Sequence, residues 1–168
     1  MAPILQTERL ILRGWRFADF SHFAGFWADP GRTRFFVSGV QSEAQSWQAF
    51  CAMAGEWQLR EFGMFAIQQK HSDTPVGHAG IWYPPDLSEP ELAWSLYVGN
   101  EGKGFATEAA GRVIEWAKSS FSWGPLMSFV HPENTASIAV AKRLGAVLES
   151  ETTLRGDPRL VFRHAQPI

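Results

Sequence analysis

The chain has 168 residues, enough for one domain with a substantial core. Hydrophobic residues make up 45% of it and charged residues 19%, and the net charge is −2. This balance gives no general attraction to nucleic-acid phosphates or anionic lipids. We therefore expect a single domain over residues 1–168, a monomer or homodimer, that binds neither nucleic acid nor membrane.

Cys51 is the only cysteine, so the chain can form no intramolecular disulfide and no thiolate metal cluster. Its place between Phe50 and Met53 in a helical pattern predicts a buried thiol. No apolar run approaches the ~18 residues of a membrane span, and residues 1–13 lack the basic start and apolar stretch of a secretion signal. These features predict a cytoplasmic protein without a bound metal.

The first third of the chain predicts one strand followed by two helices. Apolar residues alternate over 7–13 as in a strand. Asp19 is placed to cap a helix with an aromatic stripe, which ends before the breaker sequence Asp29-Pro-Gly31. A second helix starts near Ser42 and places apolar residues at helical spacing as far as Trp57.

The rest of the chain alternates strands with two more helices. Strands are predicted at 64–69, 76–83, 91–98, 126–130, 147–153 and 160–163, and helices over 106–117 and 134–144. With about seven strands and about four helices, we expect an α/β (α+β) fold. Its sheet would be mixed and mostly antiparallel, with a βαβ crossover late in the chain.

A glycine-rich turn separates the strand at 91–98 from the helix that follows, with glycines at 99, 102 and 104 around Lys103. Such glycines permit positive φ and let a ligand approach the backbone N–H groups. At the positive end of a helix dipole, those N–H groups favour phosphate. A turn that only closes the helix entry is the alternative, and we favour phosphate binding.

Two familiar phosphate loops fit this turn poorly. A Walker A loop needs Gly-x-x-x-x-Gly-Lys-Ser/Thr, but Tyr97 occupies the first glycine position and Gly104 replaces the hydroxyl residue. A Rossmann loop needs a small residue where Thr107 stands, and it opens its domain, whereas two helices and a hairpin precede this turn.

The turn instead resembles the signature of the GNAT superfamily of acetyl-CoA-dependent N-acetyltransferases, which is Arg or Gln, x, x, Gly, x, Gly or Ala. Gly104 and Ala106 fill its last two required positions, while Glu101 stands in place of Arg or Gln. That departure puts a negative charge beside the expected pyrophosphate. Five segments in order resemble the ribosomal-protein alanine N-acetyltransferase (RimJ/RimL-like) branch: 7–13, 75–80, 91–96, 102–109 and 131–146.

The resemblance implies a GNAT fold with a splayed pair of central strands, and acetyl-CoA as the donor. The strand end would pair with the pantetheine arm, with the Leu96 N–H facing the acetyl oxygen, and the turn would hold the pyrophosphate. The implied cofactor contacts are Leu96, Tyr97, Val98, Gly102, Lys103, Gly104, Phe105, Ala106, Thr107 and Asn134.

The catalytic candidates are Ser137 and Glu91. The resemblance makes Ser137 the group that protonates the departing thiolate, since its helix lacks the Tyr that many GNAT members use. From the residues alone, Asn134 is a helix N-cap and Ser137 a first-turn serine, and both interpretations stay open. For the general base we expect Glu91, acting through water, ahead of His78 and His131.

No sequence motif identifies the acceptor. We expect a protein or peptide N-terminal amine, because an α-amine of pKa ~7.7–8.0 needs less help from a base than a lysine of ~10.4. A small-molecule amine (antibiotic, polyamine or amino acid) is an alternative acceptor, and a noncatalytic acyl-CoA-binding regulatory protein is an alternative function. Several aromatic residues would line a pocket or form core, and we favour core: Trp15, Trp27, Phe35, Phe36, Trp82 and Tyr83.

Overall fold

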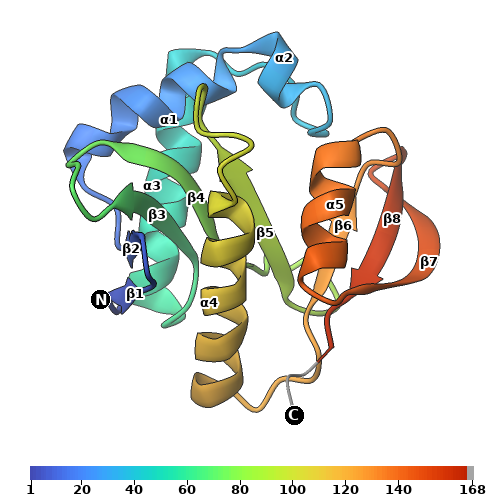
Figure 1. Ribbon diagram of the computed structural model, residues 1–168. Coiled ribbons are helices and arrows are strands. Elements are labelled where there is room, and N and C mark those ends of the chain that lie inside the picture. The colour runs from blue at the N-terminus through green and yellow to red at the C-terminus, as the bar shows by residue number, and fades with distance from the viewer. Residues whose placement is uncertain (166–168) are drawn as a thin grey trace.

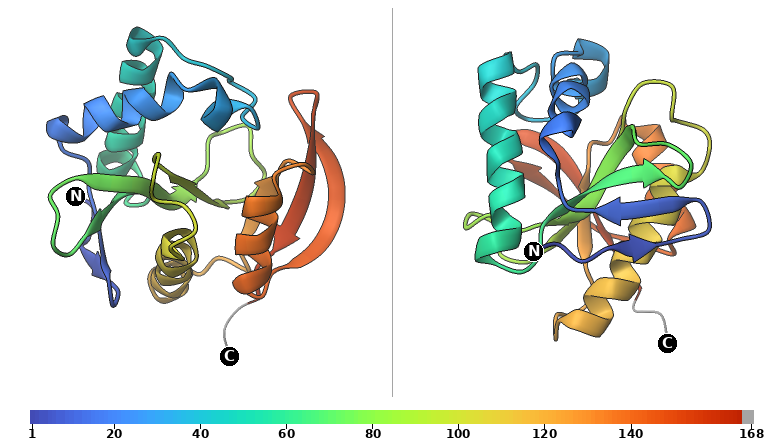
Figure 2. Two further views of the ribbon diagram at one scale, coloured as in Figure 1. Left: turned by 45° about the horizontal axis from the view of Figure 1, so that its top comes forward. Right: turned by 90° about the vertical axis from the view of Figure 1, so that its left-hand side faces the viewer.

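The computed structural model describes residues 1–165, which form one sheet with helices on both faces (Figures 1 and 2). The strands are β1 (Leu5–Gln6), β2 (Leu10–Arg13), β3 (Met64–Gln69), β4 (Pro75–Trp82), β5 (Glu91–Leu96), β6 (Met127–Val130), β7 (Val147–Leu154) and β8 (Asp157–Arg163). The helices are α1 (Phe20–Trp27), α2 (Pro30–Thr33), α3 (Glu43–Leu59), α4 (Phe105–Ser120) and α5 (Thr135–Arg143), and a 3-10 turn covers Phe17–Asp19.

The strands lie in the order β1-β2-β3-β4-β5-β6-β8-β7. Every neighbouring pair is antiparallel except β5 and β6, which are parallel and joined through the crossover helix α4. The expected α/β (α+β) class, with a mixed and mostly antiparallel sheet, is confirmed.

Of the strand expected over 7–13, only residues 10–13 form a strand, β2, which pairs with β1 in a hairpin. The N–H and the hydroxyl of Thr7 both donate to the Leu10 carbonyl oxygen, at 3.0 and 3.3 Å, and so close a turn at the start of the alternating pattern. This hairpin is why the sheet has eight strands rather than about seven.

A fifth helix, α2, forms where the sequence predicted only a break. The Asp29 carboxylate accepts two backbone N–H groups of the first turn (2.7 and 3.2 Å), and Pro30 occupies the first helical position. Asp19, by contrast, does not cap α1 as expected. Its carboxylate instead accepts two hydrogen bonds from the buried Arg13 guanidinium (2.7 and 2.8 Å).

The helices cover the sheet from two sides, α1 and α3 on one face and α4 and α5 on the other (Figures 1 and 2). An aromatic cluster fills the first side: Phe23, Phe26, Trp27, Phe50 and Tyr97. On the other side, the apolar stripe predicted for α4 is buried against the sheet. Cys51 is exposed on α3, contrary to expectation, because Phe50 and Trp57 carry the buried face.

Across residues 1–165, no helix combines the length and apolar character needed to cross a membrane. The same residues contain no group of three or more His, Cys, Asp and Glu side chains placed to hold a metal ion.

Candidate active site

Strands β5 and β6 are joined at their N-terminal ends and then diverge. Within the described residues their ladder has one register pair, Glu91 with Met127. On its other side β5 stays paired with β4 as far as Leu96. The edge of β5 that faces β6 therefore carries backbone groups without a strand partner beyond Glu91. This opening is the splayed central pair.

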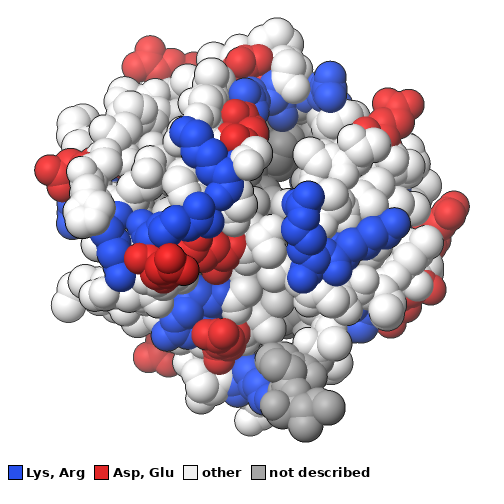
Figure 3. All heavy atoms as spheres, viewed as in Figure 1, with Lys and Arg blue, Asp and Glu red and all other residues white. Residues whose placement is uncertain are grey.

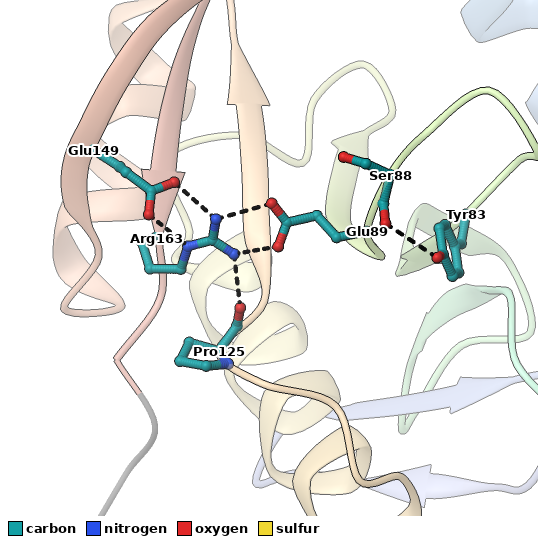
Figure 4. Close-up of polar contacts among 6 residues, drawn as sticks. All are labelled: Tyr83, Ser88, Glu89, Pro125, Glu149 and Arg163. Carbon is teal, nitrogen blue, oxygen red and sulfur yellow. Dashed lines mark hydrogen bonds and ion pairs between the residues drawn. The ribbon is translucent and has the colours of Figure 1, made fainter.

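Arg163 on β8 holds the joined end together (Figure 4). Its guanidinium donates to both carboxylate oxygens of Glu89 (2.5 and 2.9 Å), to both of Glu149 (3.1 and 2.7 Å) and to the Pro125 carbonyl (3.0 Å). Hydrogen bonds from Arg163 lower the pKa of Glu89. Because Glu89 precedes β5 and Pro125 precedes β6, one side chain ties the starts of both strands to the β7–β8 hairpin.

Ser128 on β6 adds a bond across the start of the opening. Its Oγ donates to the Leu92 carbonyl oxygen (2.6 Å) and lies 2.8 Å from His164 Nε2. Since the hydroxyl proton goes to the carbonyl, the His164 nitrogen is the donor to Ser128. Both side chains are buried, and burial lowers the pKa of His164 to about 4, so its ring is neutral at pH 7. This pair was not predicted, because its only sign in the sequence is a polar residue inside an apolar strand.

The glycine turn adopts the backbone that its sequence predicts. Gly99, Gly102 and Gly104 have φ of 81°, 72° and 80°. A Cβ at Gly102 would meet no atom within 4 Å, so a ligand can approach there. Gly104 leads into α4, whose first N–H groups have no intrahelical acceptor. The Lys103 Nζ donates to the Gly99 carbonyl (2.7 Å), and the side chain is exposed.

Glu101, the residue that departs from the family signature, is neutralised within the turn. Its carboxylate forms an ion pair with Arg32 of α2 and accepts the Gly99 N–H (3.0 Å). Lys and Arg side chains gather on both halves of the face that carries α4 and α5, with Asp and Glu side chains beside those on the left (Figure 3). The turn therefore does not present an unbalanced negative charge to an anion.

The three predicted cofactor contacts at the end of β5 differ in which of their groups a ligand could reach. Tyr97 is buried in the aromatic cluster, and its N–H donates to the Val76 carbonyl (2.9 Å). Because N–H directions alternate along a strand, the Leu96 N–H then points toward the opening. The Leu96 side chain packs on the core, while Val98 is exposed.

The predicted contacts at the start of α4 are mostly turned inward. The Phe105 and Ala106 side chains are buried, so these two residues can offer a ligand only their backbone. The Thr107 side chain is partly buried.

A cavity of about 340 Å³ lies at the opening between β5 and β6. Glu91, Asn134 and Ser137 all line it, so predicted site residues from β5 and from the start of α5 share one space. The glycine turn lies outside its walls. Of the six aromatic residues favoured as core, four line the cavity: Trp27, Phe35, Phe36 and Trp82. Trp27 is also buried in the aromatic cluster, as expected, and Phe36 packs against that cluster.

Glu91 is a partly buried carboxyl group on the cavity wall. Burial raises its pKa to about 7, although the Phe129 N–H (3.2 Å to Oε1) and the positive charge of Arg159 favour the ionised form. A carboxyl group that titrates near neutral pH is suited to accepting a proton. Of its two rivals, His78 is buried and its pKa is lowered to about 4, whereas His131 stacks on Phe35 (5.0 Å between ring centroids).

Asn134 is the N-cap of α5, since its Oδ1 accepts the Ser137 N–H (3.1 Å). This is the interpretation that the residues alone suggested. Both side chains are partly buried and line the cavity, so the cap does not remove them from a ligand's reach.

The site has the features of a coenzyme A-dependent acyltransferase. These are a splayed strand pair, an open glycine turn at the start of a helix, and a carboxyl group at the opening with a pKa of about 7. Residues 9–147 match the family model of the acetyltransferase (GNAT) domain, and the chain belongs to this family. The protein is therefore a GNAT acetyltransferase.

Two relatives are similar over most of their length. The chain is 28% identical over 142 residues to the uncharacterized N-acetyltransferase p20 of Bacillus licheniformis, covering 83% of this chain and 80% of that protein. A crystal structure of an acetyltransferase from Agrobacterium tumefaciens str. C58 is 36% identical. It superposes with a TM-score of 0.90 and covers 99% of this chain and 96% of that one.

Two more distant structures share the fold. RimL, a ribosomal L7/L12 α-N-protein acetyltransferase in complex with coenzyme A, is 16% identical with a TM-score of 0.77, over 96% of both chains. Spermidine N-acetyltransferase from Vibrio cholerae, in complex with coenzyme A and spermine, is 14% identical with a TM-score of 0.74, over 94% of both chains. One of these is named for a protein acceptor and the other for a polyamine, so the shared fold leaves the acceptor open.

Proposed function

We propose that this chain transfers the acetyl group of acetyl-CoA to a primary amine by direct attack, with no covalent enzyme intermediate. The observation that carries the proposal is the meeting of Glu91 and Ser137 in one cavity where β5 and β6 part. The acceptor we favour is a protein or peptide N-terminal amine, as in a RimJ/RimL-like enzyme. The alternative is a small-molecule amine.

The residues at the opening suit coenzyme A. The backbone N–H groups of residues 102–107, at an open and positively charged helix start, match a pyrophosphate. The unpaired edge of β5 at Leu96 matches the two amides of a pantetheine arm, which pair like a short extra strand. Asn134, on the cavity wall, would contact the same arm. When bound, acetyl-CoA supplies an acetyl group activated as a thioester.

Three groups of the chain then serve the transfer. Glu91 accepts a proton from the acceptor ammonium through water. The Leu96 N–H stabilises negative charge on the acetyl oxygen, a role worth ~3 kcal/mol per donor. Ser137 Oγ gives its proton to the departing sulfur, whose thiol pKa of ~8.5 makes that help useful rather than essential.

A thermal melt with acetyl-CoA, coenzyme A, ATP and NAD in parallel tests the donor. At ~100-fold saturation, binding adds ~2.7 kcal/mol and should raise the midpoint by several degrees. We expect only the two CoA compounds to do so, and a thiol-release assay with a panel of amines then tests transfer. A shift without thiol release for any amine would instead support the noncatalytic acyl-CoA-binding alternative. A cytoplasmic location and a monomeric or homodimeric state stay predictions.

A further inference from the structure

The cavity at the opening has mostly aromatic walls. Six Trp and Phe rings line it, contributed by both halves of the split sheet, by the end of α1 and by the segment that follows α2: Trp27, Phe35, Phe36, Trp82, Trp94 and Phe129. Only Trp27 of these six is fully buried, so the others keep ring surface open to the cavity. Such walls bind an apolar or aromatic body.

The cavity walls carry more positively charged than negatively charged side chains. Glu91 is the one carboxylate among the lining residues, whereas Arg155 and Arg159 contribute two guanidinium groups. The counter-ions of these arginines, Asp86 and Asp157, lie outside the walls. A polyamine carries further ammonium groups, which would meet arginine instead of a carboxylate. The walls therefore fit an acceptor with a single amine.

Arg159 is the more buried of the two arginines and keeps unused donors. Its Nη1 donates to the Pro158 carbonyl (2.7 Å) and pairs with Asp157 (2.5 Å), and its Nη2 donates to the Phe35 carbonyl (3.0 Å). The Nε–H and the second Nη2 hydrogen have no partner within residues 1–165. The positive charge of Arg159 favours the ionised form of Glu91, and both side chains line the cavity. A guanidinium with free N–H groups suits a carboxylate or carbonyl oxygen.

Phe35, in the segment after α2, limits the size of the acceptor because it is held against the β6–β8 half of the sheet at the cavity wall. Its carbonyl is held by Arg159 of β8, and its ring stacks on His131, which follows β6. The cavity volume of about 340 Å³ is near the lower end of ligand pockets, which span roughly 300–1,000 Å³. Within the walls there is room for one large residue.

We infer that the acceptor is the α-amine of an aromatic or bulky apolar residue, with its amine facing the acetyl group and linked to Glu91 through water, its side chain among the rings and its carbonyl or carboxylate oxygen on Arg159. The inference rests on the proposed acetyl transfer and deepens it. Two sources share this chemistry, a free amino acid and the first residue of a peptide.

An acceptor panel at fixed acetyl-CoA tests the inference through thiol release. The panel is L-phenylalanine, the dipeptide Phe-Ala, the dipeptide Ala-Ala, phenethylamine and spermidine. We expect kcat/KM for one or both phenylalanyl acceptors to exceed that for the other three by tenfold or more. The better of the two names the source, free amino acid or peptide. Equal or faster turnover of spermidine, Ala-Ala or phenethylamine would overturn the inference while leaving acetyl transfer intact. No thiol release from any amine would instead defeat the proposed function.

A pair of variants tests Arg159 separately. Arg159→Met should raise KM for the preferred phenylalanyl acceptor by at least tenfold more than KM for phenethylamine, because phenethylamine has no oxygen for the guanidinium. Arg159→Lys should restore only part of the loss, and Arg112→Met, on the outer face of α4, is the matched control. The acetyl-CoA thermal shift reports folding of each variant. Equal losses on both acceptors in a folded Arg159 variant would show a purely structural arginine and overturn its assignment.

Discussion

Ser128 Oγ donates a 2.6 Å hydrogen bond to the Leu92 carbonyl oxygen at the point where β5 and β6 stop pairing. A side chain thus supplies a contact between two strands whose backbones have begun to separate. The His164 Nε2–H donates to the same Ser128 oxygen and so fixes the orientation of the hydroxyl. The geometry lets the strands diverge for a ligand without leaving the start of the opening loose.

Ser128→Ala should lower the free energy of unfolding by about 1–3 kcal/mol, because it leaves a buried carbonyl and the His164 Nε2–H without this partner. Urea denaturation measures the loss. Ser119→Ala is the control, since the Ser119 hydroxyl bonds only the exposed end of α4 (2.9 Å to the Trp116 carbonyl) and its loss should cost less than ~0.5 kcal/mol. Equal stability of the two variants would contradict the structural role given to Ser128.

Glu91→Gln should remove one ionisation from the pH profile. The wild type takes the proton from the acceptor ammonium and needs Glu91 deprotonated, so its kcat/KM should rise through about pH 7. The variant should be slower by roughly 100-fold, and its kcat/KM should rise instead near the acceptor α-amine pKa of ~8, where the amine is already neutral. An unchanged profile in the variant would assign the base to another group.

The same carboxyl group predicts a stability difference. Its pKa in the folded protein lies above the unfolded value, so its contribution is present below about pH 4.5 and is lost as pH rises through about 7. Glu91→Gln should therefore gain stability relative to wild type over that range, by on the order of 2 kcal/mol after solvent screening. His78 and His164 titrate in both proteins and cancel in the comparison. A difference that does not change with pH would refute the raised pKa.

Much of the fold and of the turn geometry could be predicted from short-range sequence patterns. The glycine positions predicted the positive φ of the turn, and Asn134 predicted the cap of α5. The missed features depend on partners far along the chain. Ser128 and His164 are 36 residues apart, and Arg159 and Phe35 are 124 apart. Periodicity shows which face of an element is buried, but not which polar groups meet there, so these contacts had no local signal.

Ser137→Ala should lower kcat severalfold, with little change in acetyl-CoA affinity. The hydroxyl assists a leaving group that departs moderately well without it, since a thiol has a pKa of ~8.5. The Ser137 N–H that bonds Asn134 is retained in the variant, so the helix cap and the fold should persist. Steady-state kinetics and CoA titration separate the two effects, and an unchanged kcat would remove Ser137 from the mechanism.

Gly102→Ala should weaken coenzyme A binding by about tenfold, the equivalent of ~1.4 kcal/mol. The added Cβ meets no neighbouring atom, so the strain comes from φ of 72°, and the turn relieves it by changing shape. Gly156→Ala carries the same kind of strain at φ of 86° in the β7–β8 hairpin, with nothing near its Cβ. It should lose similar stability, about 1 kcal/mol, but keep CoA affinity. Equal CoA affinity in both variants would place the pyrophosphate elsewhere.

Arg32 and Glu101 should be coupled in coenzyme A binding. Arg32→Met leaves the Glu101 charge uncompensated beside the turn, which should cost about 0.5–1 kcal/mol of binding free energy, since an exposed pair is worth no more. Adding Glu101→Gln should restore affinity to the wild-type level or above it, because the repelling charge is gone. The effect should shrink at 1 M salt, where the Debye length falls to ~3 Å. Calorimetric titration of the two single variants and the double variant measures the coupling. Strictly additive losses would mean that Arg32 acts on the ligand directly and that Glu101 lies outside its field.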